Sequence, residues 1–258
     1  MGNSFSINKL YYPGYDKNPS KAVLKSGDEI TIVNFNRIIH NKSEIIGFRA
    51  FGSSSIIFIP FNMTPKLAYL IGIIFGDGSI LKPIKRKAGG YYWIVEIYCN
   101  GKHKDIILKL VKNIFNYPPV ITKDKRRKNS WKIQINSLII HRFLNKVVGI
   151  PFGKKTGQMP WLNILCKSPE IFMYFLAGLI DSDGHVTNYV INLTQKDKQF
   201  LEKVKFFSKK LLNINFRGPY INKKINNLPV AWCLQLHKTG DVNNFINTIP
   251  LRYCPEGL

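Results

Sequence analysis

Two segments of the chain end an apolar stretch with an aspartate followed by a glycine. They read LIGIIFGDG over residues 70–78 and LAGLIDSDG over residues 176–184. A helix that is apolar on every side is normally buried, whereas a carboxylate is rarely buried without a partner that compensates its charge. The sequence therefore predicts two buried helices whose terminal acids, Asp77 and Asp183, are compensated where the helices end.

Small residues recur four positions apart in both segments, as Gly72 and Gly76 in the first and as Gly178 and Ser182 in the second. This spacing places two notches on one face of a helix, so that a second helix backbone can approach closely. We expect the two helices to pack against each other and to bring their terminal aspartates side by side. The glycine that follows each aspartate fits the left-handed position that ends a helix.

Two carboxylates at the negative ends of two helix dipoles repel each other, and a divalent cation removes this conflict. A site with few oxygen ligands and room for water suits Mg²⁺, for which Mn²⁺ can substitute. Such an ion beside a phosphodiester activates water and stabilises the leaving oxygen. For a single segment the alternative is a solvated Asp-Gly turn, but two matched segments favour a metal-dependent phosphodiester hydrolase.

The apolar segments begin two copies of one longer pattern. Each copy is predicted to run helix, strand, strand, helix, strand, strand, helix, which makes the chain an α+β protein of two pseudo-symmetric repeats. Asp181 has Phe75 as its counterpart, so we assign it a structural hydrogen bond or a capping role. The expected divisions are an N-terminal extension without an assigned role at 1–61, a first repeat at 62–152, a linker at 153–170 and a second repeat at 171–258.

Alternating polarity marks one strand in each repeat, SWKIQINS in the first and AWCLQLHK in the second. Period-two alternation predicts one buried face and one polar face. Ile133 and Leu234 should therefore be buried, whereas Gln134, Gln235 and Cys233 should lie on the polar faces. In the extension, residues 27–35 and 53–61 resemble short strands.

The composition indicates a polyanionic partner. Lys and Arg total 38 against 15 Asp and Glu, a formal net charge of +23, which exceeds what solubility requires. The 4 cysteines are far apart and form no C-x-x-C pair, so neither a zinc site nor a disulfide framework is expected. No apolar stretch is long enough for a membrane span. We expect a soluble intracellular protein whose compartment, cytoplasm, nucleus or organelle, the sequence does not specify.

These motifs resemble a known family. LAGLIDSDG is similar to the signature of the LAGLIDADG homing endonucleases, and LIGIIFGDG is similar to a more divergent second copy. The resemblance runs from about residue 62 to the C-terminus and is greatest to single-chain, two-repeat members, such as intein-derived and yeast mating-type-switching endonucleases. It implies a monomer whose signature helices pack together and whose saddle-shaped antiparallel sheets form a DNA-binding groove. The implied activity is a metal-dependent double-strand break in a long, asymmetric DNA target, with short 3′ overhangs.

The resemblance also assigns roles to residues of the active site. Asp77 and Asp183 would be the metal-binding catalytic acids, and Gly76 and Ser182 would offer backbone carbonyls to the metal. The segment GKKT at residues 153–156 matches a family pattern that carries a basic catalytic residue, here Lys155. Its counterpart after the second repeat is Cys254, so the pattern is broken there, and Arg252 is the nearest substitute.

In the family, the sheets contact the major groove, where basic and amide side chains read base edges. The corresponding residues here are predicted to contact phosphates or bases of the DNA. They are Lys82, Lys85, Arg86, Lys123, Lys125, Arg126, Arg127, Lys128 and Gln134 in the first repeat, and Asn192, Thr194, Arg217, Tyr220, Lys223, Lys224, Gln235 and Arg252 in the second.

Two alternatives use the same fold without cleavage. One is an intron maturase that holds RNA, and the other is a DNA-binding regulator with an inactive nuclease site. The presence of both Asp77 and Asp183 favours cleavage.

Overall fold

The computed structural model describes residues 30–31, 37–40, 43–50, 56–60, 62–124, 129–155 and 162–251. The chain divides into two compact units. The first unit combines the described residues up to Thr64 with Gly78–Gly153, and the second combines Pro65–Asp77 with the described residues from Lys154 onward. The helix that begins the first repeat in sequence therefore packs within the second unit. No helix in the described part of the chain is long and apolar enough to cross a membrane.

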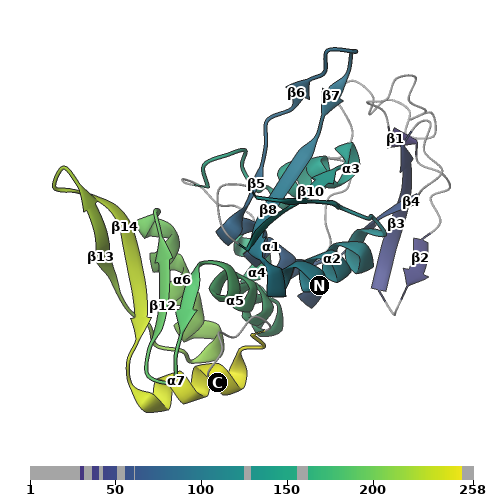
Figure 1. Cartoon of the computed structure of the whole chain (residues 1–258). Helices are drawn as coiled ribbons and strands as arrows, with labels where there is room; N and C mark the ends of the chain where they lie inside the picture. The colour runs from purple at the N-terminus through teal and green to yellow at the C-terminus, as the bar shows by residue number, and fades with distance from the viewer. Residues whose placement is uncertain are drawn as a thin grey trace. The chain divides into compact units, whose positions relative to one another are not determined.

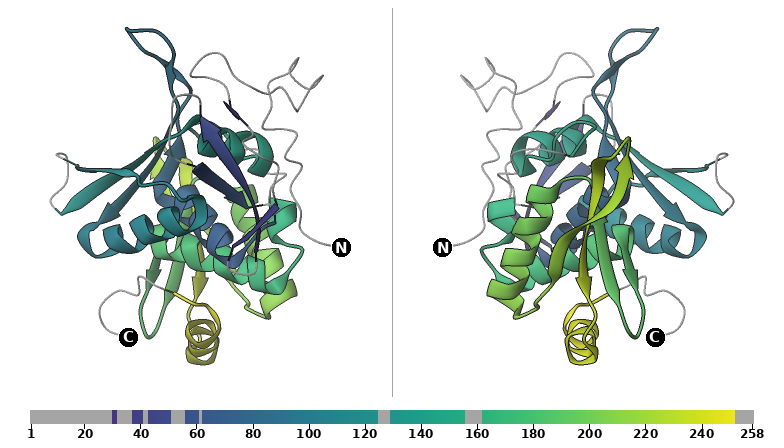
Figure 2. Two further views of the ribbon diagram at one scale, coloured as in Figure 1. Left: turned by 90° about the vertical axis from the view of Figure 1, so that its right-hand side faces the viewer. Right: turned by 90° about the vertical axis from the view of Figure 1, so that its left-hand side faces the viewer.

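The first unit contains a four-stranded antiparallel sheet in the order β5-β8-β10-β9. Its strands are β5 (Gly78–Ile80), β8 (Ile94–Asn100), β10 (Ser130–Asn136) and β9 (Val120–Lys123). Helix α2 (Gly101–Phe115) follows β8, and α3 (Leu138–Arg142) continues into a π-helix (Phe143–Val148). A hairpin of β6 (Ile84–Lys85) and β7 (Tyr91–Tyr92) is inserted between β5 and β8 and projects from the sheet of its own unit (Figures 1 and 2).

The second unit repeats this arrangement. Its sheet has the order β11-β12-β14-β13, which is the order of the first sheet position by position. The strands are β11 (Gly184–Val186), β12 (Ile191–Gln195), β13 (Arg217–Ile225) and β14 (Leu228–Leu236), and the helices are α1 (Pro65–Asp77), α4 (Leu162–Leu165), α5 (Pro169–Asp183), α6 (Lys198–Leu212) and α7 (Thr239–Thr248). In Figure 1, α6 lies against one face of this sheet. The predicted α+β fold of two repeats is confirmed.

Matching caps delimit the amphipathic helices of the two repeats. The side chain of Asn100 accepts hydrogen bonds from the first turn of α2, and that of Asp197 accepts one from the amide of Phe200 in α6. Both helices end at an asparagine in the left-handed conformation, Asn116 after α2 and Asn213 after α6. Side-chain acceptors at the start and left-handed residues at the end satisfy backbone groups that a helix leaves without partners. The caps therefore align the two helices residue by residue.

A third sheet precedes the repeats in the first unit. It consists of β1 (Ile30–Thr31), β2 (Arg37–His40), β3 (Ser43–Ala50) and β4 (Ile56–Pro60). Strands β1 and β4 lie within the two predicted strand segments, whereas the antiparallel pair of β2 and β3 was not predicted. Ile57 and Ile59 are buried, and β4 packs against α2. The extension thus contributes to the core of the first unit.

The alternation of the predicted strands is confirmed in the first repeat and holds with one exception in the second. Ile133 and Leu234 are fully buried, and Gln134 and Gln235 are partly exposed. Cys233, which was predicted on the polar face, is only 3% exposed. It sits on the central strand β14, between Thr194 of β12 and Tyr220 of β13, and these neighbours exclude water from the small thiol.

Helices α1 and α5 pack with their backbones in direct contact, as the small residues predict. A Cβ atom built on Gly72 would collide with the carbonyl oxygen of Phe175, and one built on Gly178 would collide with the carbonyl oxygen of Tyr69. At the next turn, a Cβ on Gly76 would occupy the position of the Ser182 hydroxyl. Only glycine allows this separation, so these residues determine how close the two helices come.

The prediction that glycine takes a left-handed conformation after each aspartate is wrong. Gly184 has φ −95° and ψ 166°, an extended conformation, and Gly78 already belongs to strand β5. The chain passes from helix to strand without a left-handed residue. A Cβ atom on Gly184 would lie 2.5 Å from the carbonyl oxygen of Ile180. Close approach to the helix backbone, rather than a positive φ, therefore explains this glycine.

The close contact of the two helices predicts that one added methyl group lowers the stability of the protein. We expect Gly178→Ala to lower the free energy of unfolding by about 1–3 kcal/mol, because the new Cβ forces the two backbones apart. The matched control is Gly240→Ala in α7, where a Cβ meets no atom within 4 Å. That change should be neutral or stabilising by up to about 1 kcal/mol. Chemical denaturation would measure both, and equal effects would contradict the role of Gly178.

Candidate active site

The ends of α1 and α5 place three ionisable side chains in one region of the second unit. Asp77 is the last residue of α1, Asp183 is the last residue of α5, and Lys155 comes from the segment before α4. Both carboxylates act on the Lys155 ammonium and oppose the lowering of its pKa. A Cβ atom on Gly76 would lie 3.3 Å from a carboxylate oxygen of Asp183. The helix contact therefore gathers the predicted catalytic residues Asp77, Asp183 and Lys155.

Lys155 closes the C-terminal end of α1. Its Nζ donates hydrogen bonds to the backbone carbonyls of Ile74 (2.9 Å), Phe75 and Gly76 (2.9 Å). An ammonium group has three protons, and all of them are used on carbonyls that the end of a helix leaves without intrahelical partners. Burial lowers the pKa of Lys155 to about 8, against the opposing effect of Asp183 and Asp77. The side chain is thus both a helix cap and a cation beside the two acids.

Asp183 is held by neighbouring side chains in a buried environment. Burial raises the pKa of its carboxyl group, while the charge of Lys155, a hydrogen bond from Gln195 and the charge of Lys196 lower it. The bond runs from Nε2 of Gln195, at the end of β12, to Oδ2 of Asp183. A carboxylate whose burial disfavours its charge is a position where an added cation is favourable.

The sequence analysis missed Gln195, and the pairing of the strands identifies the corresponding position in the first repeat. Gly184 pairs with Leu193 in the second sheet, and Gly78 pairs with Ile97 in the first. Two positions further along the strand, Gln195 therefore corresponds to Cys99, which is buried. A comparison of the two repeats at this strand end would have revealed the difference. The two acids consequently have different neighbours.

Gly76 and Ser182 lie at the site and form hydrogen bonds with protein groups there. The carbonyl of Gly76 accepts from Lys155. The hydroxyl of Ser182 donates to the carbonyls of Gly178 (2.8 Å) and Leu179 (3.1 Å), within its own helix. The role of these two residues as carbonyl ligands remains a prediction.

The donor set at the helix ends fits a hard divalent cation. Among the described residues, no group of three or more His, Cys, Asp or Glu side chains is arranged for a metal. Mg²⁺ is commonly bound by one or two carboxylates, with water molecules completing its coordination shell. Asp77 and Asp183 would be the protein ligands, and burial raises the pKa of Asp183, an effect that an added cation would oppose.

Asp181 has a structural partner on the opposite helix. The hydroxyl of Tyr69 in α1 donates a 2.7 Å hydrogen bond to its Oδ2. Tyr69 is fully buried, so this bond satisfies a hydroxyl in the helix interface. The predicted structural role of Asp181 agrees with this contact.

One segment of the chain is similar to a known protein family. Residues 170–238, which contain α5, α6 and the whole second sheet, match a protein-family model described as LAGLIDADG-like domain. These residues form a LAGLIDADG-like domain. The predicted resemblance is thereby confirmed.

Two kinds of relative cover most of the chain. An uncharacterized protein of Methanocaldococcus jannaschii is 27% identical over 201 residues, which are 73% of this chain and 67% of that protein. The fold is similar to that of mesophilic variants of the homing endonuclease I-DmoI, with a TM-score of 0.54, 19% identity and coverage of 73% of this chain and 93% of that one. It is equally similar to I-DmoI in complex with DNA and Mn, with a TM-score of 0.54, 18% identity and coverage of 73% and 97%. At these identities the solved structures establish the shared fold.

The sheet of the LAGLIDADG-like domain carries predicted DNA contacts on its polar face and edge. Asn192 of β12 and Arg217 of β13 both pair with Gln235 of β14, so the three lie in one row across the sheet. Thr194 occupies the next row on the same face. Further along β13, three predicted residues, Tyr220, Lys223 and Lys224, are exposed.

The polar face of the first sheet contains a buried acid that the sequence analysis missed. Glu96 of β8 is 9% exposed and accepts hydrogen bonds from Gln134 (2.8 Å), Lys132 (3.3 Å) and Tyr98 (3.2 Å). Gln134, a predicted DNA contact, is therefore held by Glu96. A single glutamate in a strand does not form a recognisable sequence pattern. The cluster becomes visible only when the strands are paired, because Glu96 lies opposite Gln134.

The remaining predicted DNA contacts divide between exposed and undescribed positions. Lys82, Lys85 and Arg86 are exposed on or beside the hairpin of β6 and β7, where the Arg86 guanidinium lies 4.3 Å from the ring centroid of Tyr92. Lys123 is exposed at the end of β9. The other predicted contacts lie outside the described residues; they are Lys125, Arg126, Arg127, Lys128 and Arg252.

The bond between the paired helices can be tested with a double-mutant cycle. Tyr69→Phe and Asp181→Ala should each remove the same hydrogen bond, so their effects on the free energy of unfolding should not add. We expect a coupling free energy of about 1.5–3 kcal/mol, the range for hydrogen bonds to charged groups. Urea denaturation of the two single variants and the double variant would measure it. Additive effects would show that the bond does not stabilise the helix pair.

Proposed function

We propose that the protein is a site-specific DNA endonuclease that makes metal-dependent double-strand breaks in a long, asymmetric target and leaves short 3′ overhangs. The observation that carries the proposal is the gathering of Asp77, Asp183 and Lys155 at the ends of the paired helices. The protein acts as a monomer, since each internal repeat supplies one acid and one sheet. We take residues 62–152 and 171–258 as those repeats, with 153–170 as the linker and 1–61 as an extension.

Asp77 and Asp183 would hold the metal, Mg²⁺ or Mn²⁺. When bound, the ion supplies activation of water and stabilisation of the leaving oxygen of a phosphodiester. Each acid serves one DNA strand. In support, solved structures describe I-DmoI in complex with DNA and Mn, in complex with DNA and Ca, and, as a G20S variant, with its target DNA in the presence of Mg.

Lys155 contributes a positive charge beside both acids. With a pKa of about 8, its ammonium form carries charge at neutral pH and can also release a proton near that pH. In the ammonium form it stabilises negative charge that develops on a phosphate near the helix ends. Gln195 orients the carboxylate of Asp183 through its hydrogen bond. Lys155 and Gln195 thus support the acids from outside the helix pair.

The polar faces and basic hairpins of the two sheets bind the DNA. Amide side chains on the strands, Gln134, Asn192 and Gln235, have the donors and acceptors that read base edges in the major groove. Exposed lysines and arginines on the hairpins contact phosphates, which carry most of the affinity. The net charge of +23 agrees with binding to a long DNA target, which is a polyanion.

The proposal predicts cleavage that depends on both acids. A randomised double-stranded DNA library incubated with Mg²⁺ should yield discrete cut sites with matched 3′ overhangs. Asp77→Asn and Asp183→Asn should each reduce cleavage by at least about 100-fold, because each weakens the metal site. Asp105→Asn on the exposed face of α2 is the matched control and should cut like the wild type. Salt-sensitive binding without cleavage would instead favour a maturase or a regulator.

The unequal neighbours of the two acids predict unequal rates for the two strands. A supercoiled plasmid carrying the target should pass through a nicked form before it becomes linear. Gln195→Met keeps the size of the side chain but removes the hydrogen bond to Asp183, so it should slow one of the two steps and lengthen the life of the nicked form. Cys99→Ala, at the matching position of the first repeat, should change neither step. Equal slowing of both strands by Gln195→Met would contradict this assignment.

A further inference from the structure

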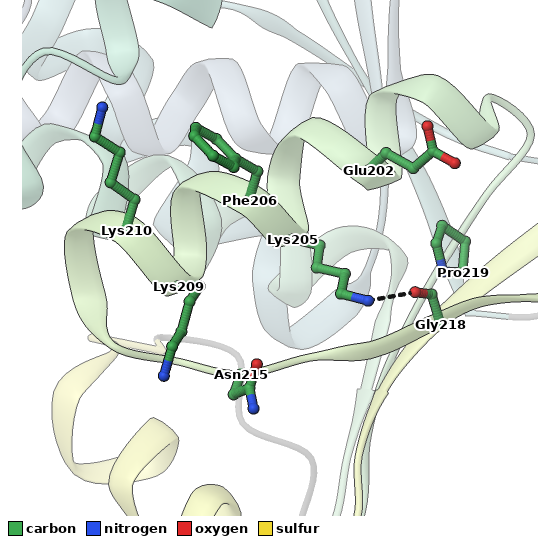
Figure 3. A pocket seen from close by; sticks show the side chains of 8 residues that line it. All are labelled: Glu202, Lys205, Phe206, Lys209, Lys210, Asn215, Gly218 and Pro219. Atoms are coloured by element: carbon green, nitrogen blue, oxygen red, sulfur yellow. Dashed lines mark hydrogen bonds between the residues drawn. The ribbon is translucent and has the colours of Figure 1, made fainter.

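One face of the LAGLIDADG-like domain contains a pocket that the proposed active site does not use. It has a volume of about 480 Å³ and lies between α6 and the start of β13 (Figure 3). Helix α6 turns Phe200, Leu201 and Val204 into the core and packs on β14 and β13. The pocket is lined by other side chains of α6, so it is separate from the acids at the end of α5 and from the polar face of the sheet.

An exposed aromatic ring lines this pocket. Phe206 is 57% exposed, although α6 has the composition of an amphipathic helix with a lysine-rich outer face. Its ring is held in an edge-to-face contact with Phe207 at 5.1 Å, and Phe207 in turn contacts Phe172 of α5. Because Asn213 and Asn116 cap α6 and α2 identically, Phe206 corresponds to the exposed Lys109 of the first repeat. The ring is therefore specific to the second repeat.

Three lysines line the same pocket as the ring. Lys210 places its ammonium 5.7 Å from the centroid of Phe206, whereas Lys205 points toward Gly218 (Figure 3) and Lys209 donates a 3.0 Å hydrogen bond to the side chain of Asn213. Lys205 donates a 2.7 Å hydrogen bond to the carbonyl of Gly218, which leaves its other protons for a ligand.

The acidic lining residue does not balance these charges. Glu202 forms an ion pair with Lys198 at 3.6 Å, on the preceding turn of α6. Lys198 lies outside the pocket lining, and the three lysines of the lining remain in excess over this one carboxylate. The pocket therefore combines an open aromatic face with a net positive charge.

We propose that this pocket binds a single-stranded segment of nucleic acid, with a base stacked on Phe206 and adjacent phosphates contacted by Lys205, Lys209 and Lys210. A flat ring next to several cations is the arrangement that binds single strands without sequence preference, since every base has a stacking face and every nucleotide a phosphate. In a duplex the bases are paired and stacked on each other, so they cannot reach Phe206. The positive charge favours this ligand over an uncharged apolar partner.

The test is binding of fluorescently labelled 12-nucleotide single strands to the full chain, followed by anisotropy, with RNA and DNA of the same mixed sequence in separate arms. Phe206→Leu keeps an apolar side chain but removes the ring, and we expect it to weaken binding by roughly 5- to 100-fold. Phe206→Trp should restore binding. Binding of either the RNA or the DNA strand supports the proposal. The strand that binds more tightly shows which of the two nucleic acids the pocket prefers.

A matched pair of variants tests the lysines. The double variant Lys209→Gln with Lys210→Gln should bind more weakly and with less dependence on salt. The slope of the logarithm of the binding constant against the logarithm of the salt concentration should become shallower by about 1.4. Lys109→Gln with Lys112→Gln removes the same charge from the corresponding helix α2 of the first repeat and should leave the affinity within about twofold of the wild type. Equal losses in the two double variants, or equal binding by Phe206→Leu and the wild type, would overturn the proposal.

Two further measurements separate this site from the active site. Excess duplex DNA or a poly-glutamate peptide should not displace the single strand from the pocket, and full displacement by either would also overturn the proposal. Phe206→Leu should cleave duplex DNA like the wild type, and Asp183→Asn should bind single strands like the wild type. The pocket proposal can therefore fail while the nuclease proposal stands, and the reverse also holds.

Discussion

The direct backbone contact between α1 and α5 is the constraint on which the rest of the site depends. Gly72 and Gly178 bring each helix against carbonyl oxygens of the other, and Gly76 makes room for the hydroxyl of Ser182 one turn further along. The contact continues to the last turn, where a Cβ on Gly76 would lie 3.3 Å from a carboxylate oxygen of Asp183, and both terminal acids act on Lys155. Ordinary helix packing, with interaxial distances of 8–10 Å, would use side chains to separate the backbones and would separate the acids as well.

That proximity has an electrostatic cost, and Lys155 compensates part of it. Two carboxylates add negative charge to the negative ends of two helix dipoles, and Asp183 is buried enough for its pKa to rise. Lys155 places one cation on the carbonyls that end α1, at the cost of its own hydration, which is why its pKa falls to about 8. Perturbed pKa values of this kind cluster at functional sites and also occur in structural ion-pair networks.

The two repeats share a sheet order but differ beside Asp183 and on the outer face of α6. Their four-stranded sheets and helix caps match position by position. Gln195 beside Asp183 has the buried Cys99 as its counterpart, and the exposed Phe206 has Lys109. Among the described residues, the hairpin of β6 and β7 between β5 and β8 has no equivalent between β11 and β12. The side chains differ at these positions, while the sheet order and the helix caps are the same in both repeats.

The sequence by itself determined the features that depend on local periodicity and residue size. Alternation placed Ile133 and Leu234 in the cores, and small residues four apart predicted the helix contact that puts Asp77 and Asp183 together. Only the tertiary structure decided the partners of those acids, since Lys155 meets the carbonyl of Gly76 from 79 positions away. The same holds for Glu96 beneath Gln134, 38 positions away, and for the extended backbone of Gly184. Such contacts follow no regular spacing in the sequence, because they form only when separate helices and strands pack together.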